Sequence, residues 1–317
     1  MSALEFEVAK LNFTTPLHIS SGKENVFDVS GDILHSDQVK GALFVTAKQL
    51  YGDEIDGSFM ETFTISSAFP YWGQSYFFPK PMMRLPLRIE GVTGESKQSK
   101  QLKKLQYIEK GWMEKVMATG ENGELIVRQN QLSANNTFLW DQAENSDQTF
   151  MKKEVQERVS IPDNREEEDP TPYFMERIYF DDHAGLFFLL QWQQGISEHQ
   201  KEQVRAAFKL LGDSGVGTDR NVGNGQFNID WDNISFNIPD NADKMMATGL
   251  FCPKAGSIEE GAYRHYRKKW VYMFSEGSVF PNDKGLEGNI VDLCPEDANI
   301  THPVWRDGTC LFLPLKA

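Results

Sequence analysis

Apolar and polar residues alternate near the start of the chain. Leu4, Phe6 and Val8 are separated by single polar or small residues, and the alternation resumes at Leu11 and Phe13 after a shift of one position. Successive side chains of a strand point to opposite faces, so this pattern predicts a strand over residues 4–13.

A helical pattern follows a polar loop. Ser36 and Asp37 are both residue types that cap the start of a helix, and Gly52 is of the type that ends one. Between them the apolar residues recur at helical spacing, which predicts one buried face. These residues are Val39, Ala42, Leu43, Ala47 and Leu50.

Two further strands are predicted much later in the chain. Residues 173–180 and 186–190 are rich in aromatic and aliphatic side chains, and the polar residues 181–185 between them are typical of a turn. Strands joined by so short a turn commonly pair with each other. We therefore expect residues 173–190 to form a hairpin.

A second helix and a last strand complete the series. Ser197 and Gln200 have the spacing of a capping box. Apolar residues then follow at helical spacing, and we expect Gly212 to end this helix. Those apolar residues are Val204, Ala207, Phe208 and Leu211. Residues 227–231 alternate again and predict a strand.

The predicted order is strand, helix, strand, strand, helix, strand, which is the split βαβ arrangement of a ferredoxin-like domain. This α+β domain covers residues 1–238 and contains an insertion at about residues 53–171. Short strand-like segments at residues 250–251, 270–274, 290–293 and 311–313 follow Ile238 and Pro239. They predict a smaller, β-rich domain over residues 239–317.

Charge and composition limit the possible functions. The net charge of −14 and the pI near 4.9 argue against a protein that holds nucleic acid by general attraction. The chain shows no signal-peptide pattern and no apolar run that could span a membrane, so we expect a cytoplasmic protein. Cys252, Cys294 and Cys310 fit neither a disulfide framework nor a zinc site, and we expect no cofactor and no metal.

The glycine-rich loop at residues 212–225 is the clearest candidate for binding. It runs from a helix into a strand, whereas dinucleotide and P-loop motifs run from a strand into a helix. Its glycines permit positive φ and close approach of a ligand backbone, its N–H groups can bind an anion, and Arg220 adds a charged fork. The alternative is a flexible connection that packs on a partner.

Histidines are the candidates for metal-independent RNA cleavage, since such a reaction needs a general base near the 2′-OH. His18 and His35 flank the first loop and could approach the glycine loop. A surface or capping role is the alternative for both. The basic and aromatic residues 264–270 could grip a phosphate backbone and stack a base, or could form a solvated face. Phe69, Tyr71 and Trp72 are further candidates for base stacking, and the alternative for all three is a place in the core.

The sequence GVGTDRNVGNGQF at residues 215–227 resembles the signature of the RAMP superfamily of CRISPR proteins. The chain more closely resembles the family of fourth subunits of the type III-A Csm effector complex. Further matching segments follow the family order. They are LHISSG at 17–22, FPY at 69–71, FPKP at 78–81, RVSI at 158–161, EGSVF at 276–280, GNIVD at 288–292 and FLPL at 312–315.

This resemblance implies two tandem ferredoxin-like (RRM-like) domains. It implies a non-catalytic subunit of a type III-A CRISPR interference complex that binds the 5′ handle of the guide RNA. Its partners would be the large polymerase-like Csm subunit and a backbone RAMP subunit. The long insertion falls where the family carries a thumb-like element that wedges between nucleotides.

The resemblance also implies a set of RNA-binding residues. In this sequence they are His18, Ser20, Ser21, Lys23, Lys80, Arg84, Arg158, Gly215, Gly217, Thr218, Asp219, Arg220, Asn221, Gly223 and Gly225. The family often has glycine where Thr218 stands and a basic residue where Gln226 stands, so backbone N–H groups should contribute more than charge. Two alternatives remain: a metal-independent RAMP endoribonuclease that processes precursor guide RNA, and a protein-only adaptor that binds a basic partner.

Overall fold

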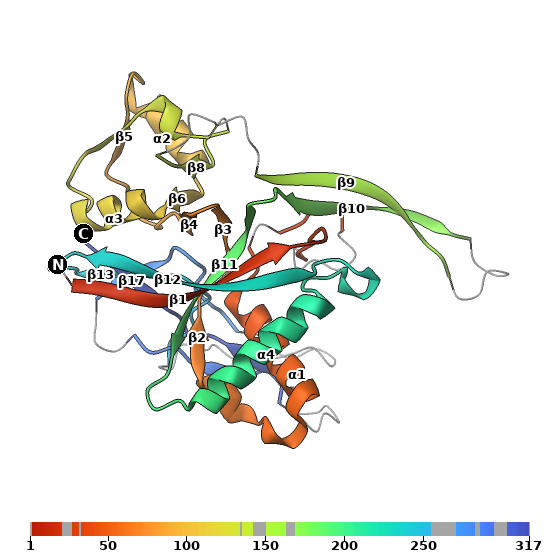
Figure 1. Ribbon diagram of the computed structural model, residues 1–317. Coiled ribbons are helices and arrows are strands. Elements are labelled where there is room, and N and C mark those ends of the chain that lie inside the picture. The colour runs from red at the N-terminus through yellow and green to blue at the C-terminus, as the bar shows by residue number, and fades with distance from the viewer. Residues whose placement is uncertain are drawn as a thin grey trace.

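A computed structural model of the chain has a mixed α+β fold (Figure 1). The structure describes residues 2–20, 27–31, 33–133, 135–141, 150–162, 169–254, 271–282, 286–294 and 303–316. No helix in this described part is long and apolar enough to cross a membrane.

One large sheet organises the molecule. Its strands lie in the order β12-β1-β11-β3-β4-β6-β8, with β2 also paired to β11. The three longest are β1 (Ser2–Phe13), β11 (Ala184–Trp192) and β12 (Phe227–Ile238), and β1 pairs antiparallel with both of the others. The strands predicted near residues 4, 186 and 227 are therefore confirmed.

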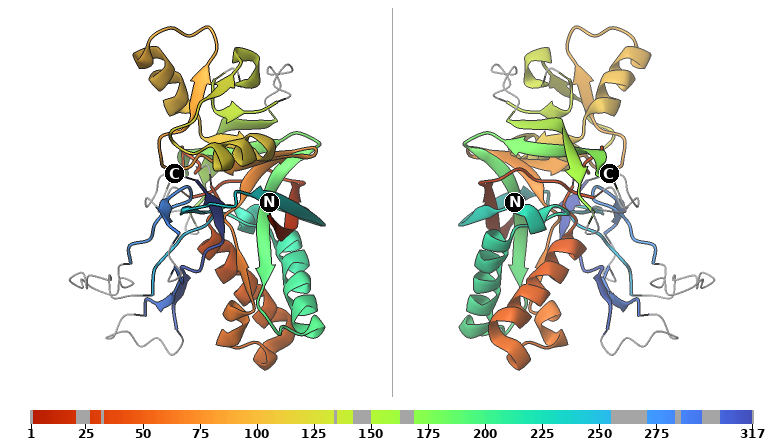
Figure 2. Two further views of the ribbon diagram at one scale, coloured as in Figure 1. Left: turned by 90° about the vertical axis from the view of Figure 1, so that its left-hand side faces the viewer. Right: turned by 90° about the vertical axis from the view of Figure 1, so that its right-hand side faces the viewer.

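Two helices cover one face of this sheet (Figure 2). They are α1 (Ser36–Tyr51) and α4 (Glu198–Ser214). The capping box of Ser197 and Gln200 is present, and the four predicted apolar positions of α4 are all buried. In α1 the predicted positions Val39, Leu43 and Ala47 are buried, Ala42 is half-buried, and Leu50 at the end of the helix is 43% exposed.

The shift in the apolar pattern of β1 reflects burial on both faces of the sheet. Ala9 and Leu11 belong to the core under the helices, whereas Phe6 and Val8 belong to the core on the opposite face. The pairing of β1 with β12 runs without interruption from Ser2 to Phe13. The alternation changes phase because the apolar side chains change face, and no residue is inserted.

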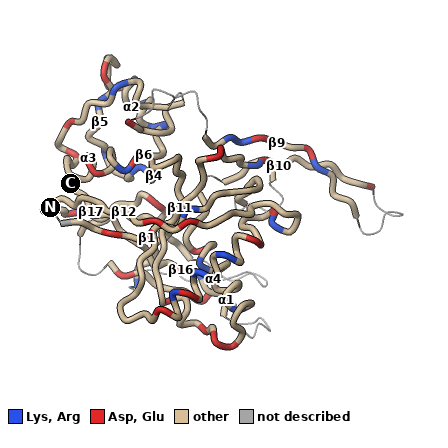
Figure 3. Tube along the Cα trace, in the orientation of Figure 1, with Lys and Arg blue, Asp and Glu red and all other residues tan. Residues whose placement is uncertain are grey.

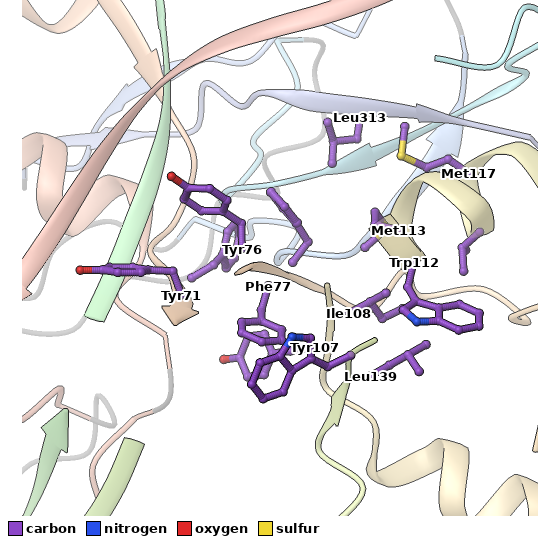
Figure 4. Packing of buried hydrophobic residues seen from close by; sticks show 14 of the residues in the cluster. Tyr71, Tyr76, Phe77, Tyr107, Ile108, Trp112, Met113, Met117, Leu139 and Leu313 are labelled. Atoms are coloured by element: carbon purple, nitrogen blue, oxygen red, sulfur yellow. The ribbon is translucent and has the colours of Figure 1, made fainter. Parts of the chain in front are cut away.

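The insertion supplies the opposite core. Its strands β3 (Phe69–Trp72), β4 (Ser75–Pro79), β6 (Tyr107–Glu109) and β8 (Phe138–Leu139) extend the sheet, and α3 (Lys110–Thr119) packs beside them. Figure 4 shows Phe77, Ile108, Met113 and Leu313 converging there. The remaining elements of this region are η1 (Gly52–Glu54), η2 (Gly57–Glu61), β2 (Phe63–Ile65), β5 (Leu87–Ile89), α2 (Glu95–Lys104), β7 (Leu125–Val127) and η3 (Gln129–Gln131).

The predicted hairpin of residues 173–190 is wrong in its pairing. The strand β10 (Thr171–Phe180) exists, but it pairs with β9 (Met151–Ser160) in a separate two-stranded ribbon that projects from the body (Figure 1). Its expected partner, β11, instead pairs with β1, β2 and β3. The place beside β11 that was predicted for residues 173–180 is taken by β2 and β3, which come from the predicted insertion.

The residues after β12 form two small sheets. One has the order β14-β13-β17, from β13 (Lys244–Ala247), β14 (Val279–Pro281) and β17 (Phe312–Leu315). The other pairs β15 (Ile290–Asp292) with β16 (Trp305–Asp307). Residues 250–251 and 271–274 make only an isolated bridge between Phe251 and Phe274, so strands there are not confirmed. A second split βαβ unit is not seen in the described part of this region.

Candidate functional site

The glycine loop begins where α4 ends. The helix passes through Gly212 and stops only at Ser214, so the predicted end at Gly212 is wrong; Gly215 follows it and donates its N–H to the carbonyl of Leu211 at 2.8 Å. A short 3₁₀ turn, η5 (Arg220–Val222), forms the tip of the loop.

The loop is fixed to the segment that follows β1. Thr218 donates its N–H to the carbonyl of His18 at 3.0 Å, and Gly225 donates to that of Pro16 at 2.8 Å. Within the loop, the N–H of Val216 bonds to the carbonyl of Gly225 at 2.9 Å. These N–H groups serve the protein's own backbone and are not available to an anion.

Three loop glycines are required by close backbone contacts. A Cβ atom would lie 2.4 Å from the carbonyl oxygen of Asn224 at Gly215, 2.3 Å from that of His18 at Gly217 and 1.9 Å from that of Val216 at Gly225. All three have positive φ. Only Gly223 would leave its added Cβ free, with no heavy atom within 4 Å. The close approach that the glycines permit is therefore largely to the chain itself.

Asp219 joins the loop to the projecting ribbon. Its Oδ2 accepts hydrogen bonds from Arg158 and Arg177, each at 2.7 Å, and from the side-chain amide of Asn224 at 2.8 Å. Arg158 was expected at the RNA, and here its charge is met by a carboxylate. Arg177 and Asn224 were missed, because nothing in their local sequence indicates a shared partner.

Arg220 is in the opposite situation. It is exposed, as are Thr218 and Asn221, and no hydrogen bond or ion pair of its guanidinium occurs within the described part of the chain. Basic and acidic residues both occur along β9 and β10 and over the rest of the molecule (Figure 3). The loop thus presents one uncompensated guanidinium on an acidic protein.

The other expected RNA-binding residues are only partly gathered here. His18 lies beside the loop, and Ser20 lines a pocket next to it. Lys80 follows β4 and donates to the carbonyl of Leu102 at 3.2 Å, and burial lowers the pKa of its ammonium group. Lys80 and the exposed Arg84 lie with the insertion, and none of their recorded contacts reaches the loop. Ser21 and Lys23, like residues 264–270, lie outside the described residues.

Both histidines considered for catalysis are engaged in the fold. His18 is 1% exposed, and its Nδ1 lies 2.6 Å from the carbonyl oxygen of Glu176. His35 Nδ1 lies 2.8 Å from Glu276 Oε1, and this hydrogen bond raises the pKa of His35 above its ordinary value. A general base must reach a substrate proton, and a ring as buried as that of His18 is poorly placed to do so.

The expected stacking residues are also largely unavailable. Phe69 is fully buried and Tyr71 is 2% exposed, so both belong to the core. Trp72 is half-buried, and its ring packs edge-on against Trp140 with 5.0 Å between ring centroids. Stacking of RNA bases needs an open ring face, which Phe69 and Tyr71 do not offer.

The base of the ribbon is anchored on the segment before α1. Ser30 donates its N–H to the Glu176 carboxylate at 2.7 Å, and Lys153 donates to the Ser30 carbonyl at 2.8 Å. Phe13 and Phe180 stack with 4.9 Å between their centroids. Together with Asp219, these contacts fix the orientation of the ribbon relative to the glycine loop.

A pocket of 260 Å³ opens between α1, the end of α4 and the glycine loop. Its buried lining is apolar and consists of Ile19, Leu34, Val39, Leu211 and Val216. Its exposed lining includes Gln38, Thr218 and Arg220. Among the described residues, no group of three or more His, Cys, Asp or Glu side chains could hold a metal ion.

Comparisons with known proteins cover nearly all of the chain. A family model for the RAMP superfamily matches residues 10–228, and one for the CRISPR Csm4 C-terminal domain matches residues 233–315. The CRISPR system Cms protein Csm4 of Thermococcus onnurineus is 26% identical over 272 residues, which are 80% of this chain and 84% of that protein.

Solved structures show a similar fold. A Csm1–Csm4 cassette in complex with cA4 contains a chain with a TM-score of 0.62 and 21% identity, covering 99% of this chain and 98% of that one. A Csm3–Csm4 subcomplex of the type III-A CRISPR-Cas interference complex contains a chain with a TM-score of 0.61 and 16% identity. The match covers 99% of this chain and 100% of that chain.

Proposed function

Because the chain belongs to the RAMP superfamily, we propose that it is a non-catalytic subunit of a type III-A CRISPR interference complex. In this role it binds the 5′ handle of the guide RNA at the glycine loop and docks the large polymerase-like subunit. The similarity to Csm4 over most of the chain supports this assignment. The Csm1–Csm4 and Csm3–Csm4 assemblies support the large subunit and a backbone RAMP subunit as partners.

The observation that carries the RNA role is the exposed guanidinium of Arg220, which has no ion pair within the described part of the chain. The loop that carries it is held by hydrogen bonds to the segment after β1 and by the ion pairs of Asp219 with the ribbon. Asp219 forms ion pairs with both Arg158 and Arg177, whereas the guanidinium of Arg220 is left to meet a phosphate. Guanidinium groups bind phosphate through two parallel hydrogen bonds. A fixed loop keeps the entropy cost of this contact low.

The domain organisation is part of this proposal. Residues 1–238 form the first ferredoxin-like domain, with its insertion at about 53–171, and residues 239–317 form a second. The match of residues 233–315 to a separate family model supports a boundary near Ile238. The ribbon begins with β9 inside the insertion and continues with β10, which runs past the predicted end of the insertion, and we assign the ribbon the role of the thumb-like element.

Replacing Arg220 by alanine tests the RNA role. We expect the complex assembled with Arg220→Ala to bind the guide RNA at least about tenfold more weakly, since a charge-assisted hydrogen bond contributes about 1.5–3 kcal/mol. Binding is measured by filter retention of labelled guide RNA at fixed salt. Arg88→Ala is the matched control, because this exposed arginine lies on β5, away from the glycine loop, and pairs with Glu124. Unchanged affinity in an intact complex would favour a protein-only adaptor.

The non-catalytic role is tested by incubating the assembled complex, and the chain alone, with repeat RNA in EDTA. We expect no cleavage, because His18 is buried and His35 is bound to Glu276. Products are resolved on denaturing gels. Cleavage that disappears in His18→Ala or His35→Ala would instead show the metal-independent RAMP endoribonuclease.

A further inference from the structure

Helix α2 concentrates positive charge on an otherwise acidic chain. Its 10 residues include several lysines and a single glutamate, whereas the whole chain has 32 basic and 46 acidic residues. The lysines are Lys97, Lys100, Lys103 and Lys104, all of them exposed. Within the described part of the chain, none of them has an ion pair or a side-chain hydrogen bond. Lys and Arg residues are blue in Figure 3, where α2 is labelled.

The contacts of α2 fix which of its sides faces the protein. The Gln98 side chain accepts from the N–H of Ile89 at 3.4 Å and donates to the carbonyl of Val92 at 3.0 Å. Leu102 packs against the core that the insertion supplies. Residues seven positions apart lie on the same side of a helix, so the one carboxylate of α2, on Glu95, lies on the side of Leu102.

The lysines lie on the other side of the helix. Lys97, Lys100 and Lys104 are three and seven positions apart and form one stripe. Ser96 and Lys103 lie on a neighbouring stripe with Lys100, again at helical spacing. Lys97 and Lys104 are separated by about 10 Å along the axis, at roughly 1.5 Å per residue. We call these four lysines and Ser96 the lysine face of α2.

Helix stability does not explain the lysine face. Cations are favourable in the last turn of a helix, and Lys103 and Lys104 lie there. Lys97 lies in the first turn, where the helix dipole disfavours a cation. Like charges three or four positions apart also repel each other, so the stripe lowers the stability of the helix that carries it.

Neighbouring carboxylates do not offset these charges. On the adjacent strands β5 and β7 and the segments beside them, Glu124 lies 3.5 Å from Arg88, and Glu90 lies 4.0 Å from Arg128. Both carboxylates therefore meet arginines and not the lysines of α2. An anionic partner would supply the opposite charge that this face lacks.

We propose that the lysine face of α2 binds the phosphate backbone of a single-stranded RNA other than the guide. Lysine binds phosphate as a point charge, whereas lysine is depleted in the interfaces between proteins. A polyphosphate therefore suits this face better than an acidic protein surface does. The helix has no aromatic residue on which a base could stack, so we expect the strand to be held without reading of its sequence.

Two features favour one strand of RNA. Domains that bind double-stranded RNA span about 16 base pairs, and a face of about 10 Å reaches only a few phosphates of one strand. Ser96 places a hydroxyl among the lysines, and a hydroxyl can bond to the 2′-OH that distinguishes RNA from DNA.

The strand is assigned as distinct from the guide because of where α2 lies. In Figure 1 the helix is in the upper part of the molecule, far from the glycine loop at the start of β12. The proposed function gives that loop to the guide. The inference therefore goes beyond the proposed function, and it is tested in a complex whose guide is already bound.

Replacing all four lysines by glutamine provides the test, because glutamine keeps the helix propensity and removes the charge. The assembled, guide-loaded complex is titrated with a labelled single-stranded RNA that is not complementary to the guide, and fluorescence anisotropy is measured at several salt concentrations. A phosphate contact contributes roughly fivefold at about 0.1 M salt, so we expect binding to weaken at least about tenfold. The slope of log affinity against log salt should become shallower by about 0.7 for each contacting lysine.

Two controls separate the face from charge in general. Replacing all four lysines by arginine keeps the charge and should preserve binding. Glutamine at four exposed lysines elsewhere removes the same charge and should leave the affinity and the salt slope close to those of the native complex. Those four are Lys48, Lys209, Lys254 and Lys316. Ser96→Ala should reduce the preference for RNA over DNA of the same sequence.

Three results would overturn the proposal. The first is an unchanged affinity and salt slope in the glutamine variant. The second is a glutamine variant that loses the large or the backbone subunit on purification, because the face then binds an acidic protein surface. The third is single-stranded DNA that binds as tightly as RNA and depends equally on the lysines. None of these results bears on Arg220, so the proposed function is tested separately.

Discussion

Asp219 and Arg220 are neighbours in the sequence, yet they stand in opposite electrostatic environments. The Asp219 carboxylate is 10% exposed and is surrounded by donors from the ribbon and from the loop itself. Arg220 faces solvent beside the pocket. An ion pair with Asp219 removes Arg158 from the charges that RNA can use, so the identity of a basic residue does not by itself indicate binding.

The loop glycines allow a direct comparison at the same scale. Gly217 and Gly223 have φ of 89° and 83°, but only at Gly217 would an added Cβ meet another atom, the carbonyl oxygen of His18. We expect Gly223→Ala to lower the free energy of unfolding by about 1–2 kcal/mol, the ordinary cost of a left-handed residue. Gly217→Ala should lower it by more, because the loop must also move away from His18.

Urea denaturation of the two variants measures this difference. Equal losses of stability would mean that the contact between the loop and residue 18 is easily displaced. In that case the loop would be less fixed than its hydrogen bonds to Pro16 and His18 indicate.

At the scale of elements, the spacing of apolar residues predicted which segments form helices and strands better than it predicted which strands pair with each other. The aromatic and aliphatic side chains of residues 173–180 predicted a strand, and β10 is one. That composition says nothing of its neighbour, because any strand with a matching register can pair there. The first seven residues of β11 are all buried, so β11 belongs between two strands of the main sheet. The half-exposed β10 suits a projecting ribbon.

The start of α1 also shows how far the local sequence can predict the role of a residue. Ser36 and Asp37 are good capping residues, but His35 occupies the N-cap position and makes no side-chain cap bond. Ser36 is buried, and its hydroxyl accepts from the N–H of Leu250 at 3.1 Å. Asp37 pairs with Arg306. Both side chains are used by the C-terminal region, which local sequence cannot reveal.

At the scale of the whole molecule, α1 makes a buried polar contact with the C-terminal region. Lys40 and Asp307 form an ion pair at 3.0 Å with side chains 1% and 0% exposed. Burial lowers the pKa of Lys40, and the charge of Asp307 opposes that effect. Such a buried pair adds little stability over an apolar pair of the same shape, but losing one partner is costly. It therefore favours one arrangement of the two regions over others.

The contact between His35 and Glu276 makes this arrangement depend on pH. The hydrogen bond from His35 to Glu276, with the nearby carboxylate of Asp37, raises the pKa of His35 above 6.5, although burial and Arg306 oppose this. Burial alone would raise the pKa of Glu276, but hydrogen bonds from His35 and Ser67 and the charge of His35 lower it below 4.5. The histidine contribution to stability is complete below pH 6.5, and the glutamate contribution is complete above pH 4.5.

Stability measurements on His35→Gln test this dependence. The difference in unfolding free energy between the native chain and the variant should be largest between about pH 4.5 and 6.5. It should shrink as the pH rises through the raised pKa of His35, and again as the pH falls through the lowered pKa of Glu276. His199→Gln, on the exposed face of α4, is the control. A difference that stays constant from pH 5 to pH 9 would show that the pair carries no linked proton.

The sequence alone determined the features that depend on neighbouring residues. The strands β1 and β12, the capping box of α4 and the glycine spacing of the loop all follow from local patterns, because backbone geometry and side-chain periodicity are local properties. The family resemblance came from the same loop and from short segments in a fixed order. It indicated a ligand without showing which loop groups are free to bind one.

Only the tertiary structure decided which polar groups remain available. It placed Arg158 on Asp219, buried His18 and left Arg220 and Gln38 open beside an apolar pocket. The N–H groups of Thr218 and Gly225, which were expected to be open to an anion, instead bond to the carbonyls of His18 and Pro16. These outcomes depend on contacts between residues far apart in the chain, and such contacts leave no period or motif in the sequence around either partner.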